Sequence, residues 1–123
     1  MKGFIHDIKD QAIENTFFRK VLETGKHTQI VLMSLPEAEE IGMETHDDND
    51  QVLYIVQGEG KAILNSEEKA FKKDDIFLVQ AGTEHNFINT GHEELKIITA
   101  YSPAHHPQGT IHETKADAQN AEY

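Results

Sequence analysis

The sequence of 123 residues contains no cysteine, no tryptophan and only three prolines. Without cysteine the chain has no disulfide framework, no thiol nucleophile and no cysteine zinc site. Its hydrophobic runs are short, like the Ile-Val-Leu-Met run at residues 30–33, whereas a membrane-spanning helix needs about 20 apolar residues. The N-terminus also lacks the apolar core of a signal peptide, so we expect a cytoplasmic protein.

Basic residues are scarce as well. The chain has 11 Lys and Arg against 22 Asp and Glu, which gives a formal net charge of −11 with neutral histidine. An acidic surface repels nucleic acid and anionic lipid, so we expect neither as a partner. A small molecule is the expected ligand or substrate.

Short hydrophobic and β-branched runs separated by turn residues predict an all-β fold. The expected strands are residues 28–35, 51–57, 61–64, 76–79, 86–88 and 95–101. Residues 51–57 and 61–64 should form a hairpin around Gly58-Glu59-Gly60. This spacing is typical of a β-sandwich or barrel, and we predict one domain over residues 1–123 with its core at about 28–101 and a polar tail at 103–123.

Helix is expected only at the two ends of the chain. Residues 7–20 fit a short helix or a strand equally well. A short helix beginning at about Lys115 is predicted, because Thr114 is a suitable N-cap and Asp117 would occupy the third helical position. In the last strand, Lys96 should face water, which directs Ile97, Thr99 and Tyr101 inward together with Leu95.

Eight histidines stand out in this composition. His46 lies just before the strand at 51–57, and an extended chain there would point Asp48 to the same side. Gln51 lies on the same face of its strand as the alternate residues that are expected to point into the core. His85 begins a later strand. An antiparallel barrel could bring these strand ends together as a site for a divalent first-row metal. The alternative is a solvated acidic loop with ordinary surface or core histidines.

These residues resemble the two motifs of the cupin superfamily, which are roughly G-x5-H-x-H-x3,4-E-x6-G and G-x5-P-x-G-x2-H-x3-N. Gly82, His85 and Asn89 match the last G, H and N of the second motif with its spacing. The first motif is matched less completely.

In the first motif, His46 fits the first histidine, and Gln51 followed by Gly58 fits E-x6-G. Asp48 stands where the second histidine belongs. Two spacings depart from the motif, since Gly42 is only four residues before His46 and the gap from Asp48 to Gln51 is one residue short.

The resemblance implies a jelly-roll barrel that holds one divalent metal ion, Mn, Fe or Zn. The implied ligands are His46, Asp48, Gln51 and His85. One carboxylate among them keeps the ligand charge at −1, as in the usual cupin set of three histidines and one glutamate. The competing interpretation is that Gln51 only forms a hydrogen bond and a weaker two-histidine site remains.

The resemblance also bears on activity. The tail is similar to that of small bacterial cupins described as mannose-6-phosphate isomerase-like (cupin type-2 conserved barrel), which implies an isomerase, epimerase or dioxygenase. The alternative is a non-catalytic binding or sensing module. Arg19 is the sole arginine, and no basic residue lies between Lys26 and Lys61, so a neutral or metal-chelating substrate with vicinal oxygens fits better than a sugar phosphate.

The remaining expectations concern the cavity and the assembly. Phe87 and Tyr101 are candidates to line the substrate cavity, with the role of ordinary core aromatics as the alternative. Small cupins usually pair by their sheets, so the resemblance implies a homodimer, with the apolar segment 17–22 crossing to the neighbour. The tail histidines His105, His106 and His112 should cover the barrel mouth or lie in solvent, and His6, His27 and His92 should lie on the surface.

Overall fold

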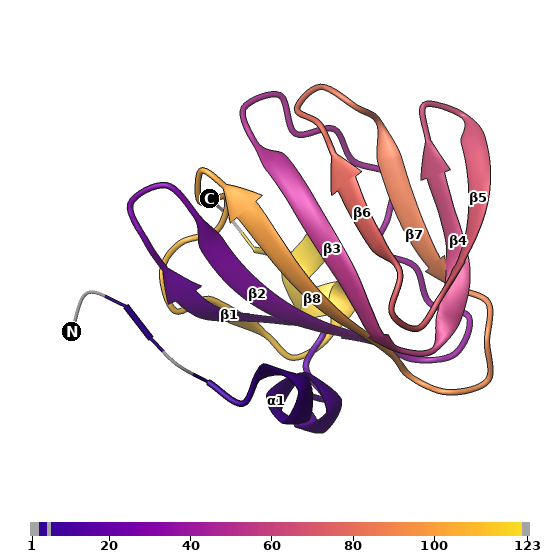
Figure 1. The fold of residues 1–123 in the computed structure, drawn as a ribbon, viewed down its shortest axis with the longest axis horizontal. Coiled ribbons are helices and arrows are strands. Elements are labelled where there is room, and N and C mark those ends of the chain that lie inside the picture. The colour runs from indigo at the N-terminus through magenta and orange to yellow at the C-terminus, as the bar shows by residue number, and fades with distance from the viewer. Residues whose placement is uncertain (1–2, 5, 122–123) are drawn as a thin grey trace.

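The computed structural model describes residues 3–4 and 6–121 and folds into two antiparallel β-sheets (Figure 1). The elements in chain order are α1 (Ile8–Glu14), β1 (Arg19–Thr24), β2 (Gln29–Leu35), β3 (Asp50–Gln57), β4 (Glu59–Leu64), β5 (Glu67–Lys72), β6 (Ile76–Val79), β7 (His85–Asn89), β8 (Leu95–Ser102), β9 (Ile111–His112) and α2 (Lys115–Gln119). One sheet has the order β6-β3-β8-β2-β1-β9 and the other β5-β4-β7. The predicted all-β fold with helix only at the ends is confirmed.

The main core fills the space between the two sheets. Alternation along the strands turns one side chain in two toward it, and Leu53, Ile55, Ile97 and Phe87 are fully buried there. The inward parity predicted for β8 is confirmed, since every second residue from Leu95 is buried. Burial of this apolar surface is the main favourable term in the stability of the fold.

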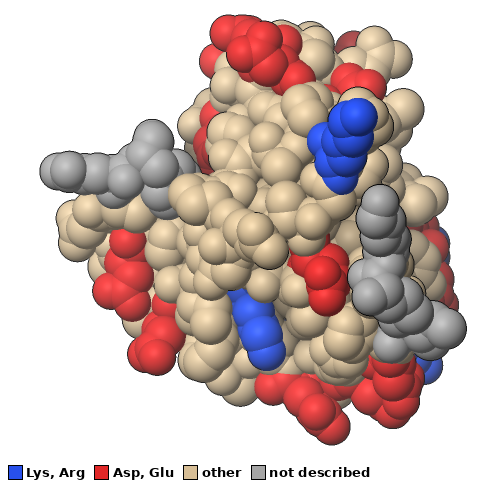
Figure 2. Space-filling view, turned by 90° about the vertical axis from the view of Figure 1, so that its left-hand side faces the viewer, with Lys and Arg blue, Asp and Glu red and all other residues tan. Residues whose placement is uncertain are grey.

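The outer surface follows the acidic composition. Figure 2 shows one face on which acidic side chains lie mostly around the periphery, basic ones are few and the centre is uncharged. Within the part of the chain that the structure describes, no helix has the length and hydrophobicity that crossing a membrane requires. Because acidic residues outnumber basic ones two to one, any place where positive side chains gather differs from the rest of this molecule.

The N-terminal region, ambiguous in sequence, divides into α1 and the start of β1. Helix α1 packs on the outer face of the larger sheet, where Ala12 contacts Leu32 and Val56. Segment 17–22, which the sequence expected to cross to a neighbour, packs within the same chain in this structure, and a crossing between copies stays a prediction. Phe18 and Val21 are buried in the chain's own core, and β1 is paired on both sides, with β2 and β9.

The hairpin predicted around residues 58–60 is wrong, because β3 and β4 belong to different sheets. Only Gly58 separates the two strands, whereas the shortest common hairpin loops have two residues. Gly58 has φ +95°, a left-handed conformation that glycine adopts without a steric cost. The chain therefore passes from one sheet to the other at this residue.

Lys96 does not face water as its sequence parity suggested. It is 3% exposed, because the end of α1 covers the outer face of β8 at this point. Its Nζ donates hydrogen bonds to the carbonyl oxygen of Asn15, to Ser34 Oγ at 3.0 Å and to Glu94 Oε2 at 2.6 Å. Lys96 thus joins α1, β2 and β8 through a buried charge.

Replacing this ammonium group by an apolar side chain should be costly. We expect Lys96→Met to lower the free energy of unfolding by about 2–4 kcal/mol, because buried acceptors lose their donor and Glu94 loses its counter-charge. The measurement is urea unfolding followed by circular dichroism. Lys61→Met is the matched control, since the Lys61–Glu68 pair is exposed and should change stability by no more than about 0.5 kcal/mol. Equal effects of the two substitutions would contradict this account.

Candidate metal and ligand site

The site begins in the extended segment that precedes β3. Side chains alternate there, so that Met43 and Thr45 are exposed while Glu44 and His46 point inward. Glu44 Oε2 lies 3.2 Å from His46 Nε2. The backbone of Glu44 pairs with that of His85 through two hydrogen bonds of 2.9 Å, which places a carboxylate directly beside the start of β7.

His105 reaches the same place from the segment after β8. The buried side chain of Gln29 on β2 holds this segment. Gln29 Oε1 accepts hydrogen bonds from the backbone amides of His105 and His106, and its Nε2 donates to the His106 carbonyl at 2.7 Å. The imidazole of His105 consequently lies 4.2 Å from that of His46, measured between ring centres.

Glu44, His46 and His105 form a group whose donor atoms all lie within 4.8 Å of one another. Donors this close can reach one ion after small side-chain rotations, because zinc binds nitrogen and oxygen at about 2.0–2.2 Å. His85 adjoins the group, with its ring centre 5.1 Å from that of His46. Its Nδ1 lies 2.8 Å from the Thr83 carbonyl, which can only accept, so Nδ1 carries the proton and Nε2 keeps a lone pair for a ligand bond.

The structure brings His46 and His85 together as the sequence predicted, whereas Asp48 lies elsewhere. Asp48 is exposed in a bend at residues 47–48 and is not part of the three-residue group. The extended conformation ends at Asp47, and with it the alternation that would have turned Asp48 inward. The carboxylate that faces His46 is that of Glu44.

Gln51 points into the core from β3 and is 3% exposed. Its Nε2 donates to Thr99 Oγ1 at 3.0 Å. Its Oε1 is buried and has no hydrogen-bond partner among the described residues. A buried acceptor without a donor is costly, so this oxygen can take part in binding a cation or a ligand. Direct metal ligation by Gln51 stays a prediction.

The motif spacing contained a signal for Glu44. When the first motif is shifted by two residues, it reads Glu44-x-His46-x4-Gln51-x6-Gly58 with every spacing correct. The shifted register puts Ala38 at the leading glycine of the motif, and Ala38 has φ +69°, a conformation that favours glycine. The carboxylate thus stands at the first histidine position of the motif and the amide at the glutamate position. His105 lies outside both motifs.

The two aromatic candidates differ in position. Tyr101 is buried among imidazoles, with its ring centre 5.8 Å from that of His46 and 5.4 Å from that of His105. Phe87 is fully buried and packs against Phe71 and Phe77 in the main core. Tyr101 therefore supports the histidine group directly, and contact of either ring with a substrate stays a prediction.

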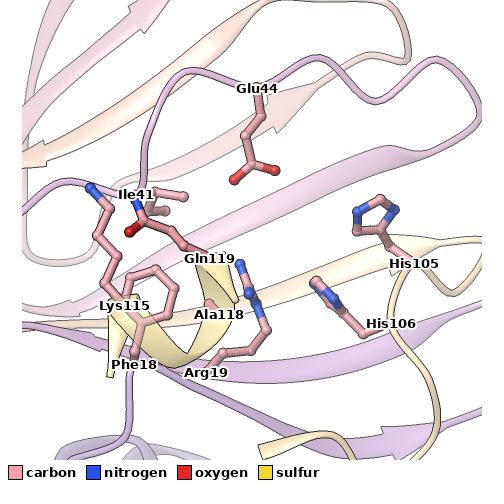
Figure 3. A pocket seen from close by; sticks show the side chains of 9 residues that line it. All are labelled: Phe18, Arg19, Ile41, Glu44, His105, His106, Lys115, Ala118 and Gln119. Carbon is pink, nitrogen blue, oxygen red and sulfur yellow. The ribbon is translucent and has the colours of Figure 1, made fainter. Parts of the chain in front are cut away.

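A pocket of about 230 Å³ opens beside Glu44 and His105 (Figure 3). His106 and Arg19 line it, together with Lys115 and Gln119 of α2. The α2 helix begins where the sequence predicted, with the Thr114 side chain accepting a hydrogen bond from the Asp117 amide. Arg19 belongs to the site, which corrects the sequence-based argument that the site lacks basic residues. Of the tail histidines, His105 and His106 line the pocket and His112 is buried beside Arg19, whereas His6, His27 and His92 are exposed as predicted.

The electrostatics of the site favour metal-binding protonation states. Burial raises the pKa of Glu44, but the hydrogen bond and the electrostatic interaction with His46, followed by the smaller effects of Arg19 and His85, outweigh it, so that the pKa is lowered overall. Burial is also the main cause that lowers the pKa of His85, of His105 and of His106, whose value falls to about 2. Neutral imidazoles and an ionised carboxylate are the forms that bind metals.

Comparison with known proteins agrees with this architecture. The family model described as "Cupin domain" matches residues 31–101. The chain is 46% identical over 128 residues to protein YrkC of Bacillus subtilis, covering 98% of this chain and 68% of YrkC. It is 29% identical over 66 residues to an oxalate-binding protein of Thermotoga maritima, covering 54% of each.

The fold has a near match among solved structures. The crystal structure of BH2720 from Bacillus halodurans superimposes with a TM-score of 0.95 at 40% identity, covering 96% of this chain and 94% of that one. The family model and these relatives together show that the chain belongs to the cupin family.

Proposed function

We propose that this cupin is a small metalloenzyme that binds one divalent metal ion and acts on an oxygen-rich small molecule. The observation that carries the proposal is the convergence of Glu44, His46 and His105, with donor atoms within 4.8 Å of one another. The lone pair of His85 and the Oε1 of Gln51, which has no hydrogen-bond partner among the described residues, lie at the same end of the barrel and support it.

The proposed ligands are Glu44, His46, His85 and His105. Three neutral imidazoles and one carboxylate give a ligand charge of −1, the same as in the common cupin set, although the carboxylate and one imidazole come from other positions of the chain. Nitrogen and carboxylate oxygen suit Mn, Fe or Zn. When bound, such an ion would act as a Lewis acid toward substrate oxygens. Glu44 would lower its charge, and Thr83 would fix the orientation of the His85 ring.

An isomerase, epimerase or dioxygenase reaction is the proposed chemistry. The second candidate is a non-catalytic binding module, which one finding favours, namely the similarity to a protein described as oxalate-binding. A screen of sugars and small acids with the metal-loaded protein separates the two. Conversion of a compound supports the enzyme, whereas saturable binding without conversion supports the module.

Substitution of single ligands tests the metal site. We expect Glu44→Ala, His46→Ala and His105→Ala each to weaken Mn²⁺ or Zn²⁺ binding by more than about 100-fold, because even changes outside the ligand shell cost about 10–100-fold. Calorimetric titration of the metal-free protein measures this. Asp48→Ala is the matched control and should stay within about twofold of the unchanged protein, since Asp48 is exposed. Loss of binding in Asp48→Ala but not in Glu44→Ala would refute the proposed ligand set.

The buried neutral imidazole of His106 predicts acid sensitivity of the metal-free fold. Its pKa is about 2 in the folded chain against an ordinary 6.5, so below pH 6.5 the unfolded chain binds a proton that the folded chain does not. The free energy of unfolding therefore decreases as the pH is lowered below 6.5. This group contributes at most about 1.4 kcal/mol per pH unit to the decrease. The contribution is fully present above pH 6.5.

The effect is measured by urea unfolding at several pH values in the presence of a chelator. His106→Phe keeps an aromatic ring and should make the pH dependence between 6.5 and 4.5 less steep. His92→Phe replaces an exposed histidine and should leave the dependence as it is. An identical slope for His106→Phe and the unchanged protein would show that His106 is not held neutral by burial.

We further propose the homodimer that the family resemblance implies, formed at the edge strand β6. Ile76 and Leu78 on β6 are 66% and 60% exposed, and β6 ends the larger sheet with one unpaired side among the described residues. Exposed apolar edge strands are prone to pair with another copy. Light scattering at high micromolar concentration should show a dimer that Leu78→Lys dissociates and that Ile111→Lys, on the opposite edge strand β9, does not. A monomeric unsubstituted protein would refute the dimer.

A further inference from the structure

Arg19 is a buried cation that has no carboxylate partner among the residues the structure describes. It is 6% exposed, its guanidinium lies 5.1 Å from the centre of the Phe18 ring, and its Nη1 donates to His112 Nδ1 at 3.2 Å. Its Nε–H is buried without an acceptor, and over residues 3–4 and 6–121 no carboxylate oxygen lies within 4.0 Å of it. Burying a charge without a counter-ion costs stability, so the arrangement lacks an anion.

The guanidinium points into the pocket of Figure 3, toward Glu44 on the opposite wall. Lys115 and Gln119 of α2 supply further hydrogen-bond donors to the same pocket. Two cationic side chains thus line it against one carboxylate. That carboxylate is already engaged by His46 at 3.2 Å, and it is also a proposed metal ligand. In a chain of net charge −11, this pocket is a local site of positive charge.

We propose that the pocket binds the carboxylate group of a small organic acid, with Arg19 as the charged anchor and Lys115 and Gln119 as additional donors. This inference deepens the proposed function. It rests on that function for a second contact, in which another oxygen of the same acid binds the metal. Of the two substrate classes that the sequence favoured, neutral or metal-chelating, the proposal keeps the metal-chelating one and adds a negative charge, because Arg19 lines the pocket.

Carboxylate fits the pocket better than phosphate. A planar guanidinium matches the two oxygens of a carboxylate with parallel hydrogen bonds. A phosphate dianion would bring more negative charge close to Glu44, with a single arginine and a single lysine to offset it. The volume of about 230 Å³ lies below the usual range for drug-sized ligands, about 300–1,000 Å³, and therefore limits the acid to a few carbon atoms.

The test measures binding of three matched probes to the metal-loaded protein by calorimetry. The probes are malonate, its neutral diamide malonamide, and phosphonoacetate, in which one carboxylate is replaced by a phosphonate. We expect malonate to bind at least about 10-fold more tightly than the other two, a difference of about 1.4 kcal/mol. Equal binding of malonamide, tighter binding of phosphonoacetate, or no binding of malonate at millimolar concentration would overturn the proposal.

Substitutions then assign the effect to Arg19. Arg19→Gln should weaken malonate binding at least about 10-fold, with a smaller loss in Lys115→Gln, while Mn²⁺ affinity stays within about twofold in both. Lys20→Gln is the matched control, because it removes one positive charge from the opposite face of the same strand, and it should leave malonate binding unchanged. Malonate should raise the melting temperature of the unsubstituted protein and not that of Arg19→Gln. Unchanged malonate affinity in folded Arg19→Gln refutes the anchor.

Arg19 is buried, so Arg19→Lys serves as a second variant that keeps the charge. If Arg19→Gln does not fold, intermediate malonate affinity in Arg19→Lys supports the proposal, and unchanged affinity overturns it. Titrations in the presence of a chelator separate this inference from the metal site. Arg19-dependent malonate binding without any metal affinity would uphold the anion pocket and refute the metalloenzyme. Metal affinity without malonate binding would refute the anion pocket and leave the metal site supported.

Discussion

The backbone pairing between Glu44 and His85 is the contact on which the site depends. Its two hydrogen bonds of 2.9 Å join the segment before β3 to the first residue of β7. Because paired residues in antiparallel strands carry neighbouring side chains, this register places the carboxylate next to one imidazole. Alternation then adds His46 two residues later. A shift of one residue would turn both inward side chains to the solvent.

The C-terminal segment turns this end of the barrel into an enclosed site. Gln29 satisfies the backbone polar groups of the segment from within the larger sheet, so that the chain can cross the barrel mouth without unpaired amides. His105 is thereby brought to the group, and α2 lies beside Arg19 on the wall opposite Glu44 (Figure 3). The enclosure also explains the low pKa values of the tail histidines, since desolvation is their largest cause.

The site combines donors for a cation with a separate donor wall for an anion. On one side are a carboxylate and imidazoles, and on the other a guanidinium, an ammonium group and an amide. Such a division suits a ligand that carries a negative charge and also offers oxygen to a metal. Binding of an anion at this site is compatible with the net negative charge of the protein. The positive charges of the site are buried or half-buried, where screening by the surrounding solution is weak.

The sequence by itself determined the β-architecture, most strand positions, the short helix at Lys115 and the participation of His46 and His85, because these follow from local periodicity and from motif spacing. The tertiary structure decided what local patterns do not encode. The alternation ends at Asp47, so that the carboxylate facing His46 is that of Glu44 and not that of Asp48. The strands β3 and β4 separate at Gly58, and α1 covers Lys96. The tertiary structure also brought Arg19 and His105 to the site from 25 residues before Glu44 and 20 residues after His85, since long-range packing, and not sequence proximity, chooses which distant side chains meet.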